Sequence, residues 1–291
     1  MQIVYHIGAN CTDNDRLLKS MLRNAEAFAA QGIKVPGPGK YRRLIRETIQ
    51  NLAGADPAPD TRDILIDAIV DDNAATRLVM SNSTFICVPS RVFENGEFYR
   101  LAEPKVRGLQ QLFPSDQIEL CLGLRNPATL IPELYNNVKN TKFDNFMRGM
   151  ALDQVRWSDV VKRIRACAPD AKLTVWCNED TPLIWSQLIR EISGIDPLTK
   201  IVGGFDLLAA IMSPEGMNRF LSYLKSHPPQ TEVQKRRIIA AFLDKYAIDS
   251  EIEDEVDLPG WTEEVLDELT EIYDEDVEEI SRMEGVKFIG V

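Results

Sequence analysis

The chain lacks the features that define membrane and secreted proteins. Its 291 residues contain no run of 18 or more apolar residues, so we expect no transmembrane helix. The start, MQIVYHIGAN, has no basic segment and no small-residue cleavage site after its apolar run, which argues against a signal peptide. With 44% hydrophobic and 27% charged residues, the composition is that of an ordinary globular protein with a large core.

Cysteine and histidine are scarce. The five cysteines are odd in number, scattered, and without a Cys-x-x-Cys pair, which argues against a disulfide framework and against a zinc site. We therefore expect a reducing, cytoplasmic environment. The two histidines, His6 and His227, form no Ser–His–Asp or Cys–His arrangement by local spacing.

Negative charge is concentrated near the C-terminus. The net charge is −12, but residues 249–287 carry seventeen acidic side chains against Arg282 and Lys287, a net charge of −15. The rest of the chain is therefore at +3. The total charge disfavours nucleic acid as a partner, whereas the mildly basic body can attract an anion.

The chain alternates buried strands with helical stretches. Short apolar runs at 2–7, 77–81, 117–124 and 173–177 predict strands. Helical spacing predicts helices at 15–31, 41–52, 61–70, 127–146, 157–166, 182–193, 214–225, 232–246 and 261–283. This order predicts a three-layer α/β fold with a central parallel sheet and a helix-rich C-terminal half. We expect one domain over residues 1–291.

The last predicted helix, about 261–283, is amphipathic and acidic. Its apolar stripe contains Trp261, Val265, Leu269, Ile272, Tyr273 and Ile280. We expect this stripe to pack on the sheet while the acidic faces meet solvent. The excess acid aids solubility, and a role in partner binding or salt tolerance stays open.

The N-terminal strand turns through Gly8 into a helix. A glycine turn between a first strand and a first helix is where α/β proteins bind phosphate. This loop has no lysine, however, and Asp13 and Asp15 lie where an anion would lie. Like charges at short range repel in a partly desolvated pocket. The alternative is a helix capped by these carboxylates without any ligand.

The loop sequence HIGANCTDNDRLL resembles the donor-binding loop of sulfotransferases, written HIGxxKTGTTxL, especially in bacterial members of the family. The resemblance implies a P-loop-type fold and sulfuryl transfer from 3′-phosphoadenosine 5′-phosphosulfate to an unknown acceptor. It places Cys11 at the lysine that contacts the transferred group, and Asn14 and Asp15 at hydroxyl residues that grip the 5′-phosphate. The donor-binding positions implied in this loop are Gly8, Cys11, Thr12, Asp13 and Asn14.

A second landmark is the sequence Leu-Arg-Asn-Pro at 124–127. It resembles the family's Arg-x-Pro segment, whose arginine and a serine eight residues later bind the 3′-phosphate of the donor. Arg125 is retained, and Glu133 stands at the serine position. The alternative for Arg125 is a strand-end arginine paired with a local carboxylate. The segments 80–85, 259–261 and 285–289 also resemble the bacterial relatives, whereas the C-terminal RKGxxGDWK motif has no match.

Few other residues suggest chemistry. His6 is a candidate base near the loop, or it simply hydrogen-bonds the backbone. Cys11 at a helix N-terminus has a reason for a lowered pKa, which neighbouring carboxylates oppose. Three consecutive oxygen donors at 13–15 rarely converge on one ion, so we expect no metal. The basic clusters at 42–43 and 235–237 are either solvated helix faces or a means of guiding an anionic ligand to the pocket.

Two functions are compatible with this sequence. The first is a sulfuryl transferase with a divergent donor site, which uses 3′-phosphoadenosine 5′-phosphosulfate and an unknown small-molecule acceptor. The second is a non-catalytic binding or scaffolding protein that retains the sulfotransferase fold. Its ligand would be neutral or cationic, or it would bind a protein partner.

Overall fold

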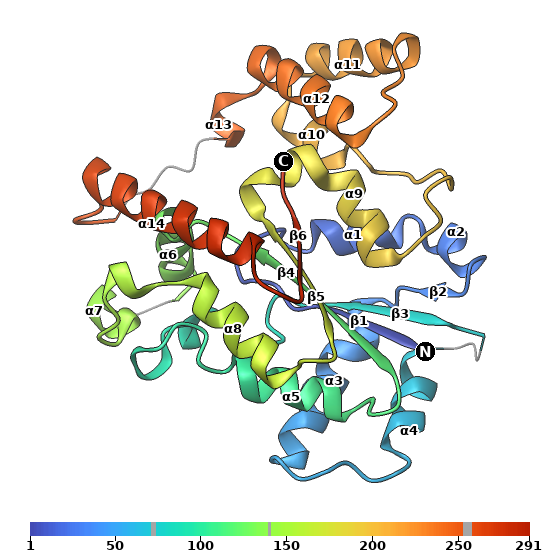
Figure 1. Cartoon of the computed structure of the whole chain (residues 1–291), viewed down its shortest axis with the longest axis vertical. Helices are drawn as coiled ribbons and strands as arrows, with labels where there is room; N and C mark the ends of the chain where they lie inside the picture. The colour runs from blue at the N-terminus through green and yellow to red at the C-terminus, as the bar shows by residue number, and fades with distance from the viewer. Residues whose placement is uncertain (71–73, 139–140, 253–257) are drawn as a thin grey trace.

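A six-stranded parallel sheet forms the centre of the computed structural model, which describes residues 1–70, 74–138, 141–252 and 258–291 (Figure 1). The strand order is β2-β3-β1-β4-β5-β6. The strands are β1 Gln2–His6, β2 Ile33–Lys34, β3 Arg77–Ser81, β4 Gln117–Leu124, β5 Lys172–Cys177 and β6 Val286–Ile289. The four expected strands are confirmed. Sequence reasoning missed β6, which pairs in parallel with β5 at the edge of the sheet.

Helices cover both faces of this sheet. Successive residues of a strand point to opposite faces, so Ile3 and Tyr5 enter one core while Val4 enters the other. The helices on the face of Tyr5 are α3 Pro38–Leu52, α4 Thr61–Ile69, α5 Ala102–Gln111, α6 Pro127–Asn136, α8 Trp157–Cys167 and α14 Glu263–Ser281. Those on the face of Val4 are α1 Arg16–Leu22, α2 Ala25–Ala29 and α9 Thr181–Ser193. The three-layer α/β fold is confirmed.

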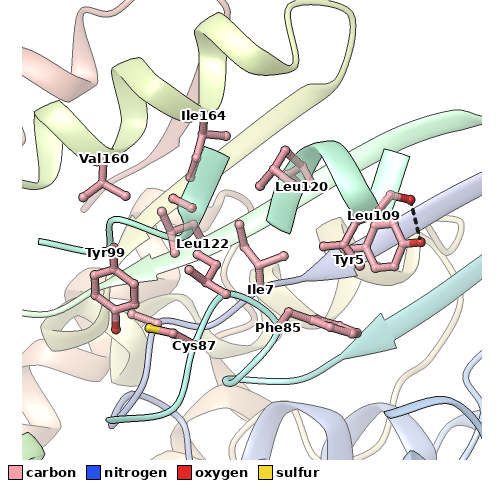
Figure 2. Close-up of a cluster of buried hydrophobic side chains, with 14 of the residues drawn as sticks. Tyr5, Ile7, Phe85, Cys87, Tyr99, Leu109, Leu120, Leu122, Val160 and Ile164 are labelled. Carbon is pink, nitrogen blue, oxygen red and sulfur yellow. Dashed lines mark hydrogen bonds between the residues drawn. The ribbon is translucent and has the colours of Figure 1, made fainter. Parts of the chain in front are cut away.

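The core on the face of Tyr5 brings distant segments together. Figure 2 shows Tyr5 and Ile7 of the first strand region near Leu120 and Leu122 of β4, with Val160 of α8 in the same view. The hydroxyl of Tyr5 donates a hydrogen bond to the carbonyl of residue 109 at 3.2 Å. This bond satisfies the only polar atom of the Tyr5 side chain inside the core.

The C-terminal half is rich in helices, as expected. Beyond α9 the chain forms α10 Asp206–Ile211, α11 Pro214–Ser226, α12 Glu232–Tyr246 and α13 Asp249–Ile252. Leu208, Met212, Phe220 and Ile239 form a small core of their own among these helices. The remaining short elements are α7 Phe143–Met147, η1 Pro89–Arg91, η2 Glu94–Gly96, η3 Leu152–Gln154 and η4 Asn178–Asp180. No helix in the described ranges is long and apolar enough to cross a membrane.

Two helices predicted as continuous are broken. The stretch 15–31 divides into α1 and α2 at Asn24, whose side-chain amide binds the carbonyl of Ser20 and both backbone groups of Val202. This tertiary contact with a loop 178 residues away overrides the helical pattern. The stretch 127–146 divides into two helices: α6 ends at Asn136, and α7 begins at Phe143.

The apolar stripe of the acidic helix α14 packs on the sheet in part, as expected. Leu269, Tyr273 and Ile280 are buried, and Tyr273 and Ile280 share the core on the face of Tyr5. The helix also lies against α6, α8 and the edge strand β6. One acidic residue of this helix, Asp276, is also buried, at 3% exposure. Its Oδ2 atom accepts the backbone N–H of Trp157 at 2.5 Å and of Ser158 at 3.0 Å, so it caps the start of α8.

Candidate functional site

The loop after β1 lies where the sheet changes its direction of growth. β1 is flanked by β3 on one side and by β4 on the other, and the chain visits β2 and β3 before it crosses to β4. Ligands of open α/β sheets bind at the carboxyl ends of the strands at such a point. The topology therefore selects the same loop as the sequence.

Gly8 allows a close approach of this loop to the segment after β3. Its φ is +108°, and a Cβ atom there would meet the carbonyl oxygen of Ser83 at 3.0 Å. A side chain would be strained at this φ in any case. On the other side the carbonyl of Gly8 accepts the N–H of Gly123 at 2.7 Å, which fastens the loop to β4.

A buried asparagine anchors the loop, which sequence reasoning missed. The backbone N–H of Asn10 donates to the hydroxyl of Tyr99 at 3.1 Å, and that hydroxyl donates to Oδ1 of Asn10 at 2.9 Å. The side-chain amide of Asn10 donates to the carbonyl of Cys87 at 3.1 Å. Figure 2 shows Tyr99 and Cys87 at this end of the core. No local signal reveals this anchor, because its partners lie more than 70 residues away.

Residues 11–15 form a tight turn. The side chains of Thr12 and Asp13 form hydrogen bonds with the backbone of this loop and of the helix that follows it. Cys11, Asn14 and Asp15 have φ values of 54°, 48° and 62°. The hydroxyl of Thr12 donates to the carbonyl of residue 9 at 2.8 Å, and Oδ2 of Asp13 accepts the N–H of Leu17 at 2.9 Å. Asp13 is therefore a helix cap. Within the described ranges, the backbone N–H groups of residues 11–15 donate to no protein acceptor.

Arg125 and Glu133, which the sequence resemblance assigned to one phosphate site, pair with each other beside this loop. Arg125 follows β4, and its Nη1 atom donates to the carbonyl of Cys11 at 2.6 Å and forms an ion pair with Glu133. Its Nε atom donates to the hydroxyl of Thr129 at 3.1 Å. The Arg125 side chain is 8% exposed and that of Glu133 34%. The carboxylate of Glu133 thus binds the guanidinium of Arg125, which the resemblance assigns to the 3′-phosphate of the donor.

Asp15 takes part in a second pair of the same kind. Its two carboxylate oxygens accept Nη1 and Nη2 of Arg42 on α3 at 2.9 Å and 2.6 Å. Hydrogen bonds from this guanidinium lower the pKa of Asp15. The same guanidinium donates to the carbonyl of Ser81 at the end of β3, from Nε at 3.0 Å. The expectation that Asp15 caps the helix is wrong, because Arg42 draws its side chain away.

The pKa of the Cys11 thiol is raised rather than lowered in this setting. Burial, reinforced by the carboxylate of Glu133, raises the pKa of Cys11 to about 12. The side-chain amide of Asn137 donates to its Sγ atom at 3.6 Å. The reason for a lowered pKa at a helix N-terminus is therefore outweighed by desolvation.

His6 is enclosed in the core beneath the loop. It is 1% exposed, and its Nδ1 atom lies 2.9 Å from the hydroxyl oxygen of Ser81. Its ring centroid is 5.6 Å from that of Trp176. Burial lowers the pKa of His6, so the imidazole is neutral at pH 7. The side chain is a packed core histidine with a hydroxyl partner.

Helix α14 lies beside the ends of β4 and β5, a contact that the sequence did not reveal. The carboxylate of Glu179, just after β5, accepts the N–H of Asn126 at 2.8 Å and the hydroxyl of Tyr273 at 3.1 Å. The indole N–H of Trp157 donates to the carbonyl of Arg125 at 2.8 Å. The bonds of Glu179 connect the ends of β4 and β5 to α14, and the indole bond of Trp157 connects the end of β4 to α8. Across the described part of the chain, no group of three His, Cys, Asp or Glu side chains could hold a metal ion.

Comparison with known proteins finds a likeness in structure but none in sequence. No protein-family model matches the chain, and no curated protein matches it. Among solved structures, it is similar to a sulfotransferase from Alicyclobacillus acidocaldarius, with 13% sequence identity and a TM-score of 0.34. The likeness covers 89% of this chain and 97% of that one.

Proposed function

We propose that this chain keeps a sulfotransferase-like fold as a binding protein and does not transfer sulfuryl groups. The ion pair between Arg125 and Glu133 carries this proposal. In the resemblance, Arg125 is the residue that receives the 3′-phosphate of 3′-phosphoadenosine 5′-phosphosulfate. A phosphate would have to displace a carboxylate that is tethered to the same guanidinium and therefore present at high effective concentration.

The 5′-phosphate side of the loop supports the same proposal. Arg42 is engaged by Asp15 through two hydrogen bonds, and no lysine stands at Cys11. An incoming phosphate would meet the carboxylates of Asp13 and Asp15 without a compensating ammonium group. The ligand expected here is therefore neutral or cationic, or a protein partner.

Sulfuryl transfer to a small-molecule acceptor is the second candidate. The observation in its favour is the set of backbone N–H groups at residues 11–15, which donate to no acceptor within the described ranges. Such groups can stabilise negative charge on sulfonyl oxygens. The remaining polar groups would be His6, Thr12 and Arg125, each of which already has a partner inside the protein.

Thermal unfolding with 3′-phosphoadenosine 5′-phosphate separates the two candidates. A ligand at 100 times its Kd adds about 2.7 kcal/mol to the unfolding free energy. We expect the native chain to show no shift in Tm at about millimolar ligand, since the two guanidinium groups beside the loop are already paired with carboxylates of the chain. A saturable shift would refute the proposal and favour the transferase.

Variants test the physical reason. Glu133→Ser frees the Arg125 guanidinium, and Cys11→Lys with Asp13→Gly restores the family's loop residues. We expect the nucleotide to bind only when these changes are combined. Glu103→Ser, which removes the exposed partner of Arg107 on α5, is the matched control and should bind nothing. If the combined variant folds and still binds nothing, occupation by carboxylates is not what prevents binding.

We further propose that residues 1–291 form one domain and that the protein works in the cytoplasm without a nucleic-acid partner. The free thiols of all five cysteines support a reducing compartment. The net charge of −12 opposes association with nucleic acid. A single cooperative transition in calorimetry would support one domain, and two separate transitions would refute it.

A further inference from the structure

A pocket lies between α9 and the helices α10 to α12, away from the loop after β1. None of the residues 8–15 line it. Its volume is about 610 Å³, which falls within the range of small-ligand sites. The segment between α9 and α10 closes one side through Gly203 and Gly204. A Cβ atom at Gly204 would meet the side chain of Ser186 at 3.2 Å, so this segment lies directly against α9.

One part of the pocket is apolar. Ile201 and Phe205 come from the segment before α10, and Met217 and Leu221 come from α11. The ring of Phe205 packs edge-to-face on Phe220, with 5.1 Å between the centroids, which holds it in place. Leu221 is one of the large apolar side chains that remain exposed. A short alkyl chain or a ring would gain apolar contact here.

The other part of the pocket is cationic. Arg190 of α9, Lys200 and Lys235 of α12 all line it. The Lys235 side chain is only 14% exposed, and its ammonium donates to the hydroxyl of Ser186 at 2.7 Å. In the described part of the chain, Arg190 and Lys200 form no ion pair.

Two carboxylates also line the pocket, but both are already neutralised. Asp206 forms an ion pair with Arg23 of the segment after α1. Glu232 pairs with Lys235 at 2.5 Å, three residues away on the same helix. The local balance is therefore positive, in a protein whose net charge is −12. A ligand with several negative charges would be repelled by the whole molecule, whereas one negative charge can be accepted locally.

We propose that this pocket binds a small amphipathic monoanion, namely a carboxylic acid with a medium-length alkyl or aryl body. The guanidinium of Arg190 and the ammonium of Lys200 receive the carboxylate. The apolar body covers Phe205 and Met217. This inference is independent of the function proposed for the loop after β1, since the two sites share no residue.

Calorimetric titration of the full chain with octanoate tests the proposal. We expect saturable binding at one site, and a Kd about tenfold higher in Lys200→Gln and in Arg190→Gln. Lys225→Gln, an exposed lysine of α11 outside the pocket, is the matched control and should keep the native Kd. Neutral 1-octanol should bind at least about tenfold more weakly than octanoate.

Three results would overturn the proposal. They are no saturable binding up to about 10 mM octanoate, equal Kd values for the pocket variants and the control, and equal affinity for octanol. Arg190→Gln also removes a hydrogen bond to the carbonyl of Asp196, so its circular dichroism spectrum is compared with that of the native chain. Lys200 is exposed, and its variant tests the charge argument even if Arg190→Gln does not fold. Competition by 3′-phosphoadenosine 5′-phosphate would place octanoate at the loop instead and refute the second site.

Discussion

Replacement of Asp276 by alanine should destabilise the protein more than the same replacement of any other acidic residue of helix α14. Its carboxylate is buried and accepts two backbone N–H groups at the start of α8, from Trp157 and Ser158. Both residues are themselves buried. Alanine leaves these donors without an acceptor and removes two hydrogen bonds between α14 and α8.

The size of the effect follows from these two bonds. A hydrogen bond to a charged group contributes about 1.5–3 kcal/mol, and an unmade buried donor costs a similar amount. Burial also raises the pKa of Asp276, which means that the ionised carboxylate is itself disfavoured in the folded state. This penalty offsets part of the gain, so we expect a loss of about 2–4 kcal/mol. For a protein of this size, the corresponding fall in Tm is roughly 3–7 °C.

Calorimetry of Asp276→Ala, Asp276→Asn and the exposed control Glu275→Ala measures this effect. Asparagine keeps one acceptor oxygen, so its loss should be about 1 kcal/mol or less. Because the folded pKa is raised, the native chain should lose stability relative to Asp276→Asn as the pH rises from the unfolded value of 3.8 through the folded value. If Asp276→Ala and Glu275→Ala unfold at the same temperature, the carboxylate does not cap α8.

Three further outcomes follow from the geometry near the strand ends. Tyr99→Phe removes the hydroxyl that exchanges two hydrogen bonds with Asn10 and should lower the unfolding free energy by about 2 kcal/mol; an unchanged urea midpoint would contradict this. Cys11, with a pKa of about 12, should react with iodoacetamide at about pH 8 far more slowly in the native than in the urea-unfolded chain, as read by mass spectrometry; equal rates would show that the thiol is not protected. Burial raises the pKa of Asp180 from 3.8 to about 6, so the native chain should lose stability relative to Asp180→Asn as the pH rises through that interval, and a constant difference in Tm would exclude this.

Much of the fold was predictable because its strands are nearly continuous apolar runs. Residues 77–81 and 117–124 were placed with the bounds that the structure gives to β3 and β4. The edge strand β6 was missed, since it has only four residues and is half-buried. The predicted helix 15–31 failed at Asn24, because the loop that competes for its side chain is 178 residues distant and leaves no local signal.

The candidate site was predicted in part. Sequence resemblance selected Arg125 and Glu133 as two positions of one phosphate-binding motif, and pairing of Arg125 with a local carboxylate stayed open as the alternative. The structure brings them into one ion pair on the carbonyl of Cys11. The basic residue Arg42 was expected either on a solvated face or near an anionic ligand, and its partner is Asp15.

The sequence by itself determined the periodic features of this protein. These are the buried strands, the glycine at position 8 and the concentration of acid after residue 249, because each depends on neighbouring residues alone. Only the tertiary structure decided which charges meet. The pairs Arg125–Glu133 and Arg42–Asp15 arise where β3 and β4 flank β1, and Asp276 meets α8 through packing between distant elements. Electrostatic partners are fixed by distance in space, which sequence separation does not encode.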